Sequence, residues 1–450
     1  MNTTTTDASP PVCGSRALTS LQQAFNSALT RQLPTADVSL LVAYSGGLDS
    51  HVLLWLAKLW AEARPSSHVR AIYIDHGLQK QSDRWGEHCA QVCSNLGIPL
   101  QVLAVQVETN GEQSPEEAAR TARYLALQQA MQMGEFLVTG HHADDQAETL
   151  LLQLMRGAGV RGLSSMPECG EFGCGFHLRP LLNCPAETLV QAGAELDLRW
   201  IDDPSNSDQR YDRNLIRHSV MPLLKARWPS LALNLSRTAA HCHEAAEISA
   251  FAAESLLGQC KDQLQLSLGV FGGLPVLHRK NLLRHWIESQ GYRPPSSAQL
   301  NRMLADLVDA SSDSAGLVNF GDAQIRRYRN TLYLGLRGVL ESVKDFEYRW
   351  SDTQSPLVIA ETGRVLTRAD ITFRPGSVPT GSVIVQNRRG GERIQLAGRS
   401  HSKTIKALLQ EKGCPPWERS RVPLVFVDGE LAAIIDIGVS AAFSSRITTS

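Results

Sequence analysis

The chain has 450 residues, of which 43% are hydrophobic and 20% are charged, a composition typical of soluble globular proteins. At about 150 residues per domain, this length predicts roughly two to four domains. The 44 Lys and Arg residues balance 45 Asp and Glu residues to a net charge of −1, which excludes nucleic-acid binding through bulk positive charge.

The first half of the chain alternates helical patterns with short apolar runs. An amphipathic helix is predicted over 17–32, because apolar residues recur there every three or four positions. Runs typical of buried strands lie at 38–44, 69–74, 100–105 and 135–139. Helical patterns lie at 50–63, 82–97, 115–133 and 143–156. This alternation predicts an α/β fold with a doubly wound parallel sheet, in which ligands bind at the carboxyl ends of the strands.

The pattern changes after about residue 225. Helical patterns over 228–260 and 275–309, followed by strand-like pieces within 316–336, indicate a small, mainly helical domain. A polar stretch over 338–356 is interpreted as a linker, and short strands around a helix near 402–412 predict a small α+β C-terminal domain. The expected parts are an N-terminal extension (1–35), a catalytic domain (36–225), a mainly helical domain (226–340) and a C-terminal domain (357–450).

Six residues after the first predicted strand, Ser45-Gly46-Gly47-Leu48-Asp49-Ser50, are typical of a phosphate-binding turn. Two glycines let the backbone approach an anion, the helix N-terminus adds partial positive charge, and Ser45 and Ser50 add hydroxyl donors. The alternative is a glycine-rich turn without a ligand. We predict a di- or triphosphate site, which is not a Walker loop because the chain contains no Gly-Lys dipeptide.

This turn resembles the pyrophosphate loop of the ATP-pyrophosphatase superfamily, whose members cleave ATP between the α- and β-phosphates. Tyr73–Leu78, Glu117–Tyr124 and Gly140–Thr149 follow in order, and segments within 203–217 and 389–419 agree. Together these motifs resemble the tRNA(Ile)-lysidine synthase family, closely over 36–225 and well over about the last 70 residues.

The resemblance implies a PP-loop ligase that uses ATP and Mg²⁺ in two steps. The wobble cytidine in the CAU anticodon of isoleucine tRNA is adenylated at its C2 oxygen with release of pyrophosphate. The ε-amine of free L-lysine then displaces AMP, and the lysidine formed changes the codon and amino-acid specificity. The alternatives are another PP-loop tRNA-modifying enzyme and a non-catalytic RNA-binding protein.

The resemblance also implies roles near the nucleotide. Mg²⁺ prefers one or two carboxylates plus water, so Asp49 and Asp145 are its candidate ligands. Both lie near predicted helix N-termini, where carboxylates are favoured in any case. Asp75 and His76, at the end of the second strand, would line the ATP site, with an unliganded Asp-His-Gly turn as the alternative. The loop residues expected to bind ATP are Ser45, Gly46, Gly47, Leu48, Asp49 and Ser50.

The chemistry asks for further catalytic groups. Lysine must lose a proton before its amine attacks, and His141 or a neighbouring carboxylate could take that proton. A packed core histidine is the alternative. Arg120 and Arg123 are one helical turn apart and could contact phosphate or the developing charge of AMP. Ordinary surface arginines are the alternative there.

A local basic segment could supply the RNA contact that the net charge does not predict. Between 387 and 421, nine basic residues stand against three acidic ones, a net charge of +6, with Trp417 among them. A solvated charged helix face is the alternative. Arg213, Asn214 and Arg217 could also hold RNA phosphates, or Asp202 and Asp203 could simply pair them. The predicted tRNA-binding residues are Arg213, Asn214, Arg217, Arg389, Arg393, Lys403 and Arg419.

The sequence also predicts where the protein works. No apolar run reaches the roughly 18 residues of a membrane span, and no secretory leader is readable. The nine cysteines include no C-x-x-C pair, which argues against zinc, iron–sulfur and redox sites. Cys89 and Cys93 are expected to be buried thiols. We expect a cytoplasmic enzyme that binds no membrane, and homodimer formation is left open.

Overall fold

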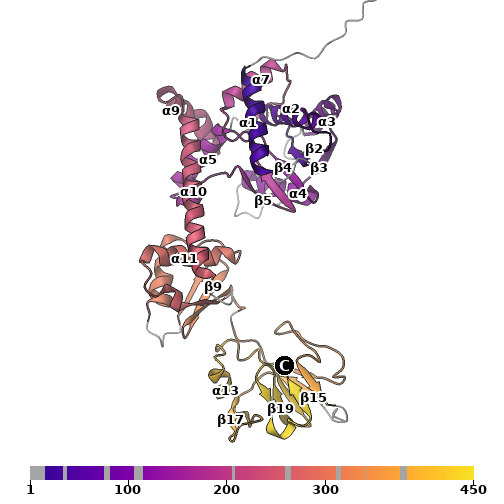
Figure 1. The fold of residues 1–450 in the computed structure, drawn as a ribbon, viewed down its shortest axis with the longest axis vertical. Helices are drawn as coiled ribbons and strands as arrows, with labels where there is room; N and C mark the ends of the chain where they lie inside the picture. Colours follow the sequence, from indigo (N-terminus) through magenta and orange to yellow (C-terminus); the bar gives the residue numbers. More distant parts are fainter. Residues whose placement is uncertain are drawn as a thin grey trace, which may run out of the picture. The chain divides into compact units, whose positions relative to one another are not determined.

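The computed structural model describes residues 16–33, 38–75, 82–105, 115–204, 208–258, 265–310, 316–339, 341–374 and 383–449. Residues 1–248 and 249–450 form two compact units, which are described here one at a time (Figure 1). His76 lies outside the described residues. Across the ranges given above, no helix is both long and apolar enough to cross a membrane.

The first unit contains a six-stranded sheet in the order β3-β2-β1-β4-β6-β5. The four strands that the sequence predicts are parallel neighbours in it: β1 (Ser39–Ala43), β2 (His68–Asp75), β3 (Leu100–Ala104) and β4 (Glu135–Val138). The helices between them are α2 (Leu48–Glu62), α3 (Ser82–Leu96) and α4 (Pro115–Ala130). The predicted doubly wound parallel α/β fold is therefore confirmed.

Alternate residues of β1 enter two different hydrophobic cores, because side chains of a strand point to opposite faces of a sheet. Leu40 packs in a core with α2 and with α1 (Arg16–Gln32). Leu41 packs on the other face with Leu127 of α4. Since α1 buries its apolar stripe in the first core, residues 16–32 of the expected N-terminal extension pack as part of the sheet domain.

A hairpin that the sequence analysis missed completes the sheet. Strands β5 (Cys169–Phe172) and β6 (Gly175–Leu178) pair antiparallel, and β6 lies parallel to β4. Both strands have four residues and contain glycine, so they carry no clear alternation of apolar and polar residues. The helix α7 (Ala186–Glu195), also missed, buries Leu189 in the same core as α1.

Helices dominate the rest of the first unit. The predicted helix after β4 is α5 (Ala143–Met155). The later helices are α6 (Val160–Leu163), α8 (Asp212–Leu215), the π-helical turn η2 (Ile216–Val220), α9 (Met221–Arg227) and α10 (Leu231–Leu257), the last of which continues into the second unit. A small core that includes Ala143, Ile216 and Met221 joins α5 to η2 and α9.

The second unit begins with helices packed on an antiparallel sheet. The sheet order is β7-β10-β9-β8, from β7 (Gln265–Ser267), β8 (Leu317–Phe320), β9 (Ala323–Tyr328) and β10 (Thr331–Leu336). The helices are η3 (Leu268–Phe271), α11 (Val276–Ser289), α12 (Ser297–Met303) and η4 (Leu304–Val308). Trp286 and Ile325 are buried in their shared core.

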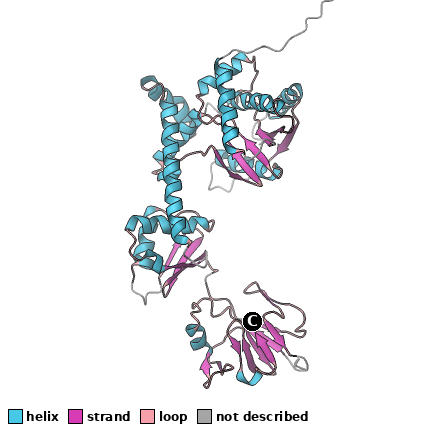
Figure 2. Cartoon of the chain, viewed as in Figure 1, coloured by secondary structure: helices cyan, strands magenta, loops and turns pink. Residues whose placement is uncertain are grey.

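The C-terminal part is mostly antiparallel strands (Figure 2). Its main sheet contains β11 (Glu347–Arg349), β15 (Val383–Gln386), β18 (Leu424–Val427), β19 (Glu430–Ile434) and β20 (Gly438–Val439). The remaining elements are β12 (Leu357–Ile359), β13 (Arg364–Leu366), β14 (Ile371–Phe373), β16 (Arg393–Ile394), β17 (Lys403–Thr404), α13 (Ile405–Glu411), η5 (Ala441–Phe443) and β21 (Ile447–Thr449). The interpretation of 338–356 as a linker is wrong in part, because β11 lies there and Phe346 and Trp350 are buried in this core.

Candidate active site at the carboxyl end of the parallel sheet

The glycine turn lies where β1 ends and α2 begins, at the carboxyl edge of the sheet. Gly46 has φ +80°, which favours glycine, and a Cβ at this position would lie 2.7 Å from the side chain of Ile201. Ser45 and Ser50 close the turn with hydroxyls 3.0 Å apart, and Ser50 donates to the Gly47 carbonyl at 2.9 Å. The turn is thus held by its own side chains.

The amides of this turn are open to a ligand. Within the described part of the chain, the N–H groups of Gly46, Gly47, Leu48 and Asp49 have no protein acceptor. Gly47 is the N-cap residue of α2 and offers no capping side chain. Unsatisfied amides at a helix N-terminus form a ready anion site.

A second segment approaches this turn so closely that it needs glycine. A Cβ on Gly140, two residues after β4, would lie 2.8 Å from the Asp49 carbonyl oxygen. The next residues then reach the same place, because His142 is the N-cap residue of α5 and its Nε2 lies 3.6 Å from Asp49 Oδ2. The Asp49 side chain is 46% exposed and so is accessible to a ligand.

The sequence analysis missed His142, which is buried between two carboxylates. Its Nδ1 lies 3.4 Å from Asp145 Oδ2, on the side opposite Asp49. Burial lowers the pKa of His142, but the charges of Asp145 and Asp49 outweigh it and raise the pKa to about 9. Nδ1 also accepts the Asp145 backbone N–H at 3.3 Å, which caps α5 and requires a lone pair on that nitrogen, so the ring connects Asp49 to α5 through its Nε2.

Asp145, predicted to bind metal, is occupied by protein donors. Its Oδ1 accepts from Arg213 at 3.1 Å and from Arg217 at 2.8 Å, and its Oδ2 accepts from the His142 backbone N–H at 3.1 Å. Burial raises the pKa of Asp145, but His142 and these arginines lower it to about 2. Direct metal coordination by Asp145 would have to displace the arginines, so the arrangement favours Asp49 alone as the protein ligand.

Arg213 and Arg217, predicted to hold RNA, are instead paired inside the first unit. Besides Asp145, both contact the buried carboxylate of Glu148, at 2.9 Å from Arg213 Nε and 2.6 Å from Arg217 Nε. Asn214 donates to the Asp208 carbonyl at 3.0 Å. Two guanidiniums facing two carboxylates have no net charge to attract phosphate, so these contacts tie α8 and η2 to α5.

His141 lies in a different environment from its neighbour His142. Its Nδ1 is 2.7 Å from Thr139 Oγ1, which lies 2.9 Å from His177 Nε2. Burial lowers the pKa of His141 to about 3, against a smaller opposing effect of Asp145. A ring with so low a pKa is a weak base, which argues against the predicted role as proton acceptor.

The predicted arginines of α4 lie near this histidine group. The Arg120 guanidinium is 5.1 Å from the Tyr124 ring, and Tyr124 lies 5.9 Å from His177. Arg120 is exposed and Arg123 is half-buried, and neither has an ion-pair partner within the ranges that the structure describes. They remain available to an anion. Asp75 ends β2 at the same carboxyl edge of the sheet.

The basic segment 387–421 is divided between exposed and engaged residues. Arg389, Arg393 and Lys403 are exposed, although Arg389 pairs with Glu347 and Lys403 with Glu411. Arg419 is half-buried and donates to the Tyr328 hydroxyl at 3.1 Å and to the Cys414 carbonyl at 3.0 Å. Trp417 is only 6% exposed, so little of its ring is accessible to a ligand.

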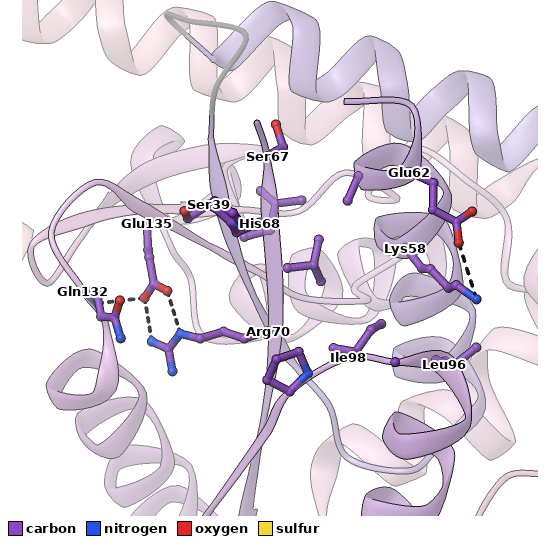
Figure 3. A pocket seen from close by; sticks show the side chains of 15 residues that line it. Ser39, Lys58, Glu62, Ser67, His68, Arg70, Leu96, Ile98, Gln132 and Glu135 are labelled. Carbon is purple, nitrogen blue, oxygen red and sulfur yellow. Dashed lines mark hydrogen bonds and ion pairs between the residues drawn. The ribbon is translucent and has the colours of Figure 1, made fainter. Parts of the chain in front are cut away.

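One cavity lies away from this site. It measures about 540 Å³ and lies at the opposite edge of the sheet, where β1 and β2 begin (Figure 3). Arg70 faces Glu135 there with two contacts of 2.6 Å, a pair that joins β2 to β4. A smaller cavity of about 310 Å³ does adjoin the candidate site and is lined by His142, Asp144, Glu148 and Arg217, among others.

The cysteine prediction is confirmed. Cys89 and Cys93 are 0% and 1% exposed. Burial raises the pKa of Cys89 to about 12 and that of Cys93 to about 11, so both are inert thiols.

Several site residues escaped the sequence analysis for a common reason. His142 and Glu148 lie in the segment 140–149, but nothing in their spacing says that one lies between two carboxylates and that the other is paired with arginine. Lys225, which pairs with Asp144, lies about 80 residues further along the chain. Only the fold brings these side chains together.

Known proteins resemble this chain over most of its length. Family models match a PP-loop domain over residues 17–224, a TilS substrate binding domain over 266–333 and a TilS substrate C-terminal domain over 383–448. The tRNA(Ile)-lysidine synthase of Methylococcus capsulatus is 40% identical over 87% of this chain and 90% of its own. That of Coxiella burnetii is 35% identical over 92% of each chain.

Solved structures match parts of the chain. The U34-tRNA thiolase NcsA from Methanococcus maripaludis has 18% identity and a TM-score of 0.44 over 51% of this chain and 80% of its own. A TilS C-terminal domain has 25% identity and a TM-score of 0.18 over 22% of this chain and 84% of its own.

Proposed function

Because this chain belongs to the tRNA(Ile)-lysidine synthase family of PP-loop ligases, we propose that it joins free L-lysine to C2 of the wobble cytidine in the CAU anticodon of isoleucine tRNA. ATP activates the cytidine as an adenylate, and the lysine ε-amine replaces AMP. The single observation that carries the proposal at the site is the open set of amides at the start of α2, beside an accessible Asp49.

The glycine turn would bind the β- and γ-phosphates of ATP. Its free N–H groups and the N-terminus of α2 present partial positive charge to one place. As the cytidine oxygen attacks the α-phosphorus, negative charge grows on the departing pyrophosphate. Donors already in position stabilise this charge without reorganising, which lowers the barrier.

The donor set at Asp49 fits Mg²⁺. This ion usually takes one or two protein carboxylates and completes its shell with phosphate oxygens and water. Asp49 is exposed enough to be such a ligand, whereas Asp145 already accepts from Arg213 and Arg217. Bound Mg²⁺ would supply charge neutralisation on the phosphates. His142, whose Nε2 lies 3.6 Å from Asp49 Oδ2, would hold the Asp49 carboxylate in position.

The 310 Å³ cavity beside His142 is the proposed place for free lysine. Asp144, Glu148, Arg217 and Lys225 line it, and because Lys225 is paired with Asp144 and Arg217 with Glu148, free lysine would bind there by exchanging these ion pairs for its own. Free lysine carries two ammonium groups and one carboxylate, which matches a cavity lined by both acidic and basic side chains. The cavity shares His142 with the proposed ATP site, so the two substrates would lie side by side.

The exposed cations of the C-terminal part would bind tRNA phosphates. We expect that replacing Arg389, Arg393 and Lys403 together with Ala weakens tRNA binding and reduces the slope of log Kd against log salt by about 2 to 3, because each phosphate contact releases a counterion. Filter binding at several salt concentrations measures this. The matched control replaces Arg302, Arg349 and Arg368, which lie elsewhere in the second unit. An unchanged slope would move the RNA surface to another part of the chain.

The decisive experiment is mass analysis of the wobble nucleoside after incubation of tRNA, ATP, Mg²⁺ and lysine with the protein. We expect cytidine 34 to gain one lysine with loss of one water. The same tRNA with uridine at this position should gain nothing. Norleucine, which lacks the ε-amine, should leave cytidine without an adduct. Another modified base, or none, would favour a different PP-loop enzyme or a non-catalytic RNA-binding protein, respectively.

A single substitution tests the proposed metal ligand. Asp49→Asn should reduce pyrophosphate release by about 10²-fold or more, since a lost metal contact removes several kcal/mol of transition-state stabilisation. Its tRNA affinity should stay near that of the wild type. Asp197→Asn is the matched control, because Asp197 is exposed and has φ +48°, which asparagine also adopts. Full activity of Asp49→Asn would place the metal elsewhere.

A further inference from the structure

Four side chains form a continuous hydrogen-bonded row at the carboxyl ends of β4 and β6. Arg179 Nη2 lies 3.1 Å from His177 Nδ1, His177 Nε2 lies 2.9 Å from Thr139 Oγ1, and Thr139 Oγ1 lies 2.7 Å from His141 Nδ1. Arg179 and His177 are 8% and 4% exposed, so water competes little for these contacts. None of the roles derived above accounts for this row.

The first member of the row determines which nitrogen of His177 carries a proton. A guanidinium only donates hydrogen bonds, so His177 Nδ1 must accept and be unprotonated. A neutral imidazole has one N–H, which therefore lies on Nε2 and donates to Thr139 Oγ1. A second proton on His177 is opposed by burial and by the Arg179 charge, which lower the pKa of this ring to about 2.

The Thr139 hydroxyl determines which nitrogen of His141 accepts a hydrogen bond. Thr139 is 4% exposed, and among the described residues its Oγ1 contacts only the two histidine rings. A buried hydroxyl proton without an acceptor costs about 1–3 kcal/mol. Because Oγ1 already accepts from His177, its own proton goes to His141 Nδ1.

We infer that this row holds His141 as a neutral imidazole with its proton on Nε2, which makes His141 a hydrogen-bond donor to the substrate rather than a base. Nε2 has no partner among the described residues and is not one of their buried unpaired atoms, in a ring that is half-buried. Arg179, His177 and Thr139 are then positioning residues, and they act through His141.

The charges around the ring agree with a neutral donor that faces an anion. The positive charges of Arg120, Arg179 and Arg213 disfavour a second proton on His141. The negative charge of Asp145 favours one. The Tyr124 ring lies 5.9 Å from the His177 ring. An N–H group surrounded by these positively charged arginines would bind an oxygen that carries negative charge.

The proposed function supplies such an oxygen, and the assignment of a target rests on it. His141 follows Gly140, which contacts the Asp49 backbone, so the ring lies beside the proposed ATP site. We assign its Nε2–H to an α-phosphate oxygen.

When the cytidine oxygen bonds to the α-phosphorus, pyrophosphate leaves with the electron pair of the broken P–O bond. When the lysine nitrogen bonds to C2, AMP leaves with the C–O pair, and the amine proton goes to solvent. His141 keeps its proton in both steps.

The first test reads the protons directly and needs no activity. Long-range ¹H–¹⁵N NMR of the full chain labelled with [¹⁵N]histidine should show His141 and His177 with protonated Nε2 and unprotonated Nδ1, unchanged from about pH 8 to about pH 6. The His141 signals are assigned with His141→Gln. A proton on Nδ1 of His141, or two protons near neutral pH, would overturn the inference whatever reaction the protein catalyses.

A matched pair of variants tests the row itself. Thr139→Val keeps the shape but loses the hydroxyl, so we expect His141 to show a mixture of tautomers. Thr139→Ser restores the hydroxyl and should restore the single tautomer. If Thr139→Val does not fold, Arg179→Met should free His177 Nδ1 and give the same mixture. The single tautomer in both variants would show that the row does not determine it.

The last test separates a donor from a base. The glutamine amide donates at nearly the place of Nε2–H, so His141→Gln should lose less than about tenfold in kcat, whereas His141→Ala should lose about 10²-fold, with KM for ATP little changed in both. Equal losses in the two variants, with a new dependence of kcat on added amine bases, would identify His141 as the base. If the wild type makes no lysidine, the proposed function fails while the NMR result stands.

Discussion

Two adjacent histidines show that surroundings, not residue type, decide charge. His141 has a pKa near 3 because burial and nearby arginines disfavour its cation, whereas His142 has a pKa near 9 because two carboxylates outweigh the same burial. Sequence alone gives both residues the ordinary value of about 6.5.

These pKa shifts predict that the free energy of unfolding is greatest near pH 6.5. His141 and His177 have folded pKa values of about 3 and about 2, so on acidification below 6.5 the unfolded chain binds protons that the native state refuses, and stability is lost. Together they should cost up to roughly 3 kcal/mol per pH unit. The raised pKa of His142, about 9, contributes stability that is complete below 6.5 and is lost as pH rises to about 9.

Urea denaturation of the full chain between about pH 5 and about pH 9 measures this profile. The variant His177→Gln should flatten its acid limb, and His142→Gln should flatten the alkaline limb only. A profile whose two limbs respond equally to both variants would contradict the assignments.

At the scale of elements, the site depends on how closely β4 approaches α2. The sequence predicts both elements, because an apolar run and a helical pattern are local properties. It does not predict that the Gly140 Cα lies against the backbone of Asp49, which only the order of strands in the sheet decides.

Gly140→Ala should therefore separate β4 from α2. The new Cβ would lie 2.8 Å from the Asp49 carbonyl oxygen, and backbone on both sides must shift, at a cost of about 1–3 kcal/mol in the free energy of unfolding. The shift also moves Asp49, so pyrophosphate release should fall more than stability alone explains. Gly159→Ala is the control, since Gly159 has φ −76° and nothing within 4 Å of a new Cβ. Equal activities of the two variants would disprove the tight approach.

At the scale of the second unit, Trp417 and Arg419 join parts that the sequence analysis kept separate. The Trp417 ring lies 5.4 Å from that of Tyr333 and 6.2 Å from that of Tyr328, and Arg326 lies 5.4 Å from it. These partners belong to β9 and β10, and Arg419, which the sequence analysis predicts to bind tRNA, donates to the Tyr328 hydroxyl of β9, so both residues connect the two folded parts of this unit.

Trp417→Ala should loosen this contact. Truncating a buried tryptophan costs about 3–5 kcal/mol, and here the lost contacts include those with Tyr328, Tyr333 and Arg326. We expect an additional thermal transition, faster proteolysis between residues 337 and 345, and a higher KM for tRNA. ATP binding by the first unit should not change. Lys412→Ala, an exposed change in the same segment, is the control. One unchanged transition would mean that the two parts do not depend on Trp417.

The sequence by itself determined the parallel sheet, the position of the glycine turn and the family, because these follow from local periodicity and from contiguous motifs. The tertiary structure alone decided that Arg213 and Arg217 face Asp145 and Glu148, and that neighbouring carboxylates raise the pKa of His142 whereas burial lowers that of His141. The physical reason is that charge, pairing and burial depend on neighbours distant in the chain, which local sequence patterns do not contain.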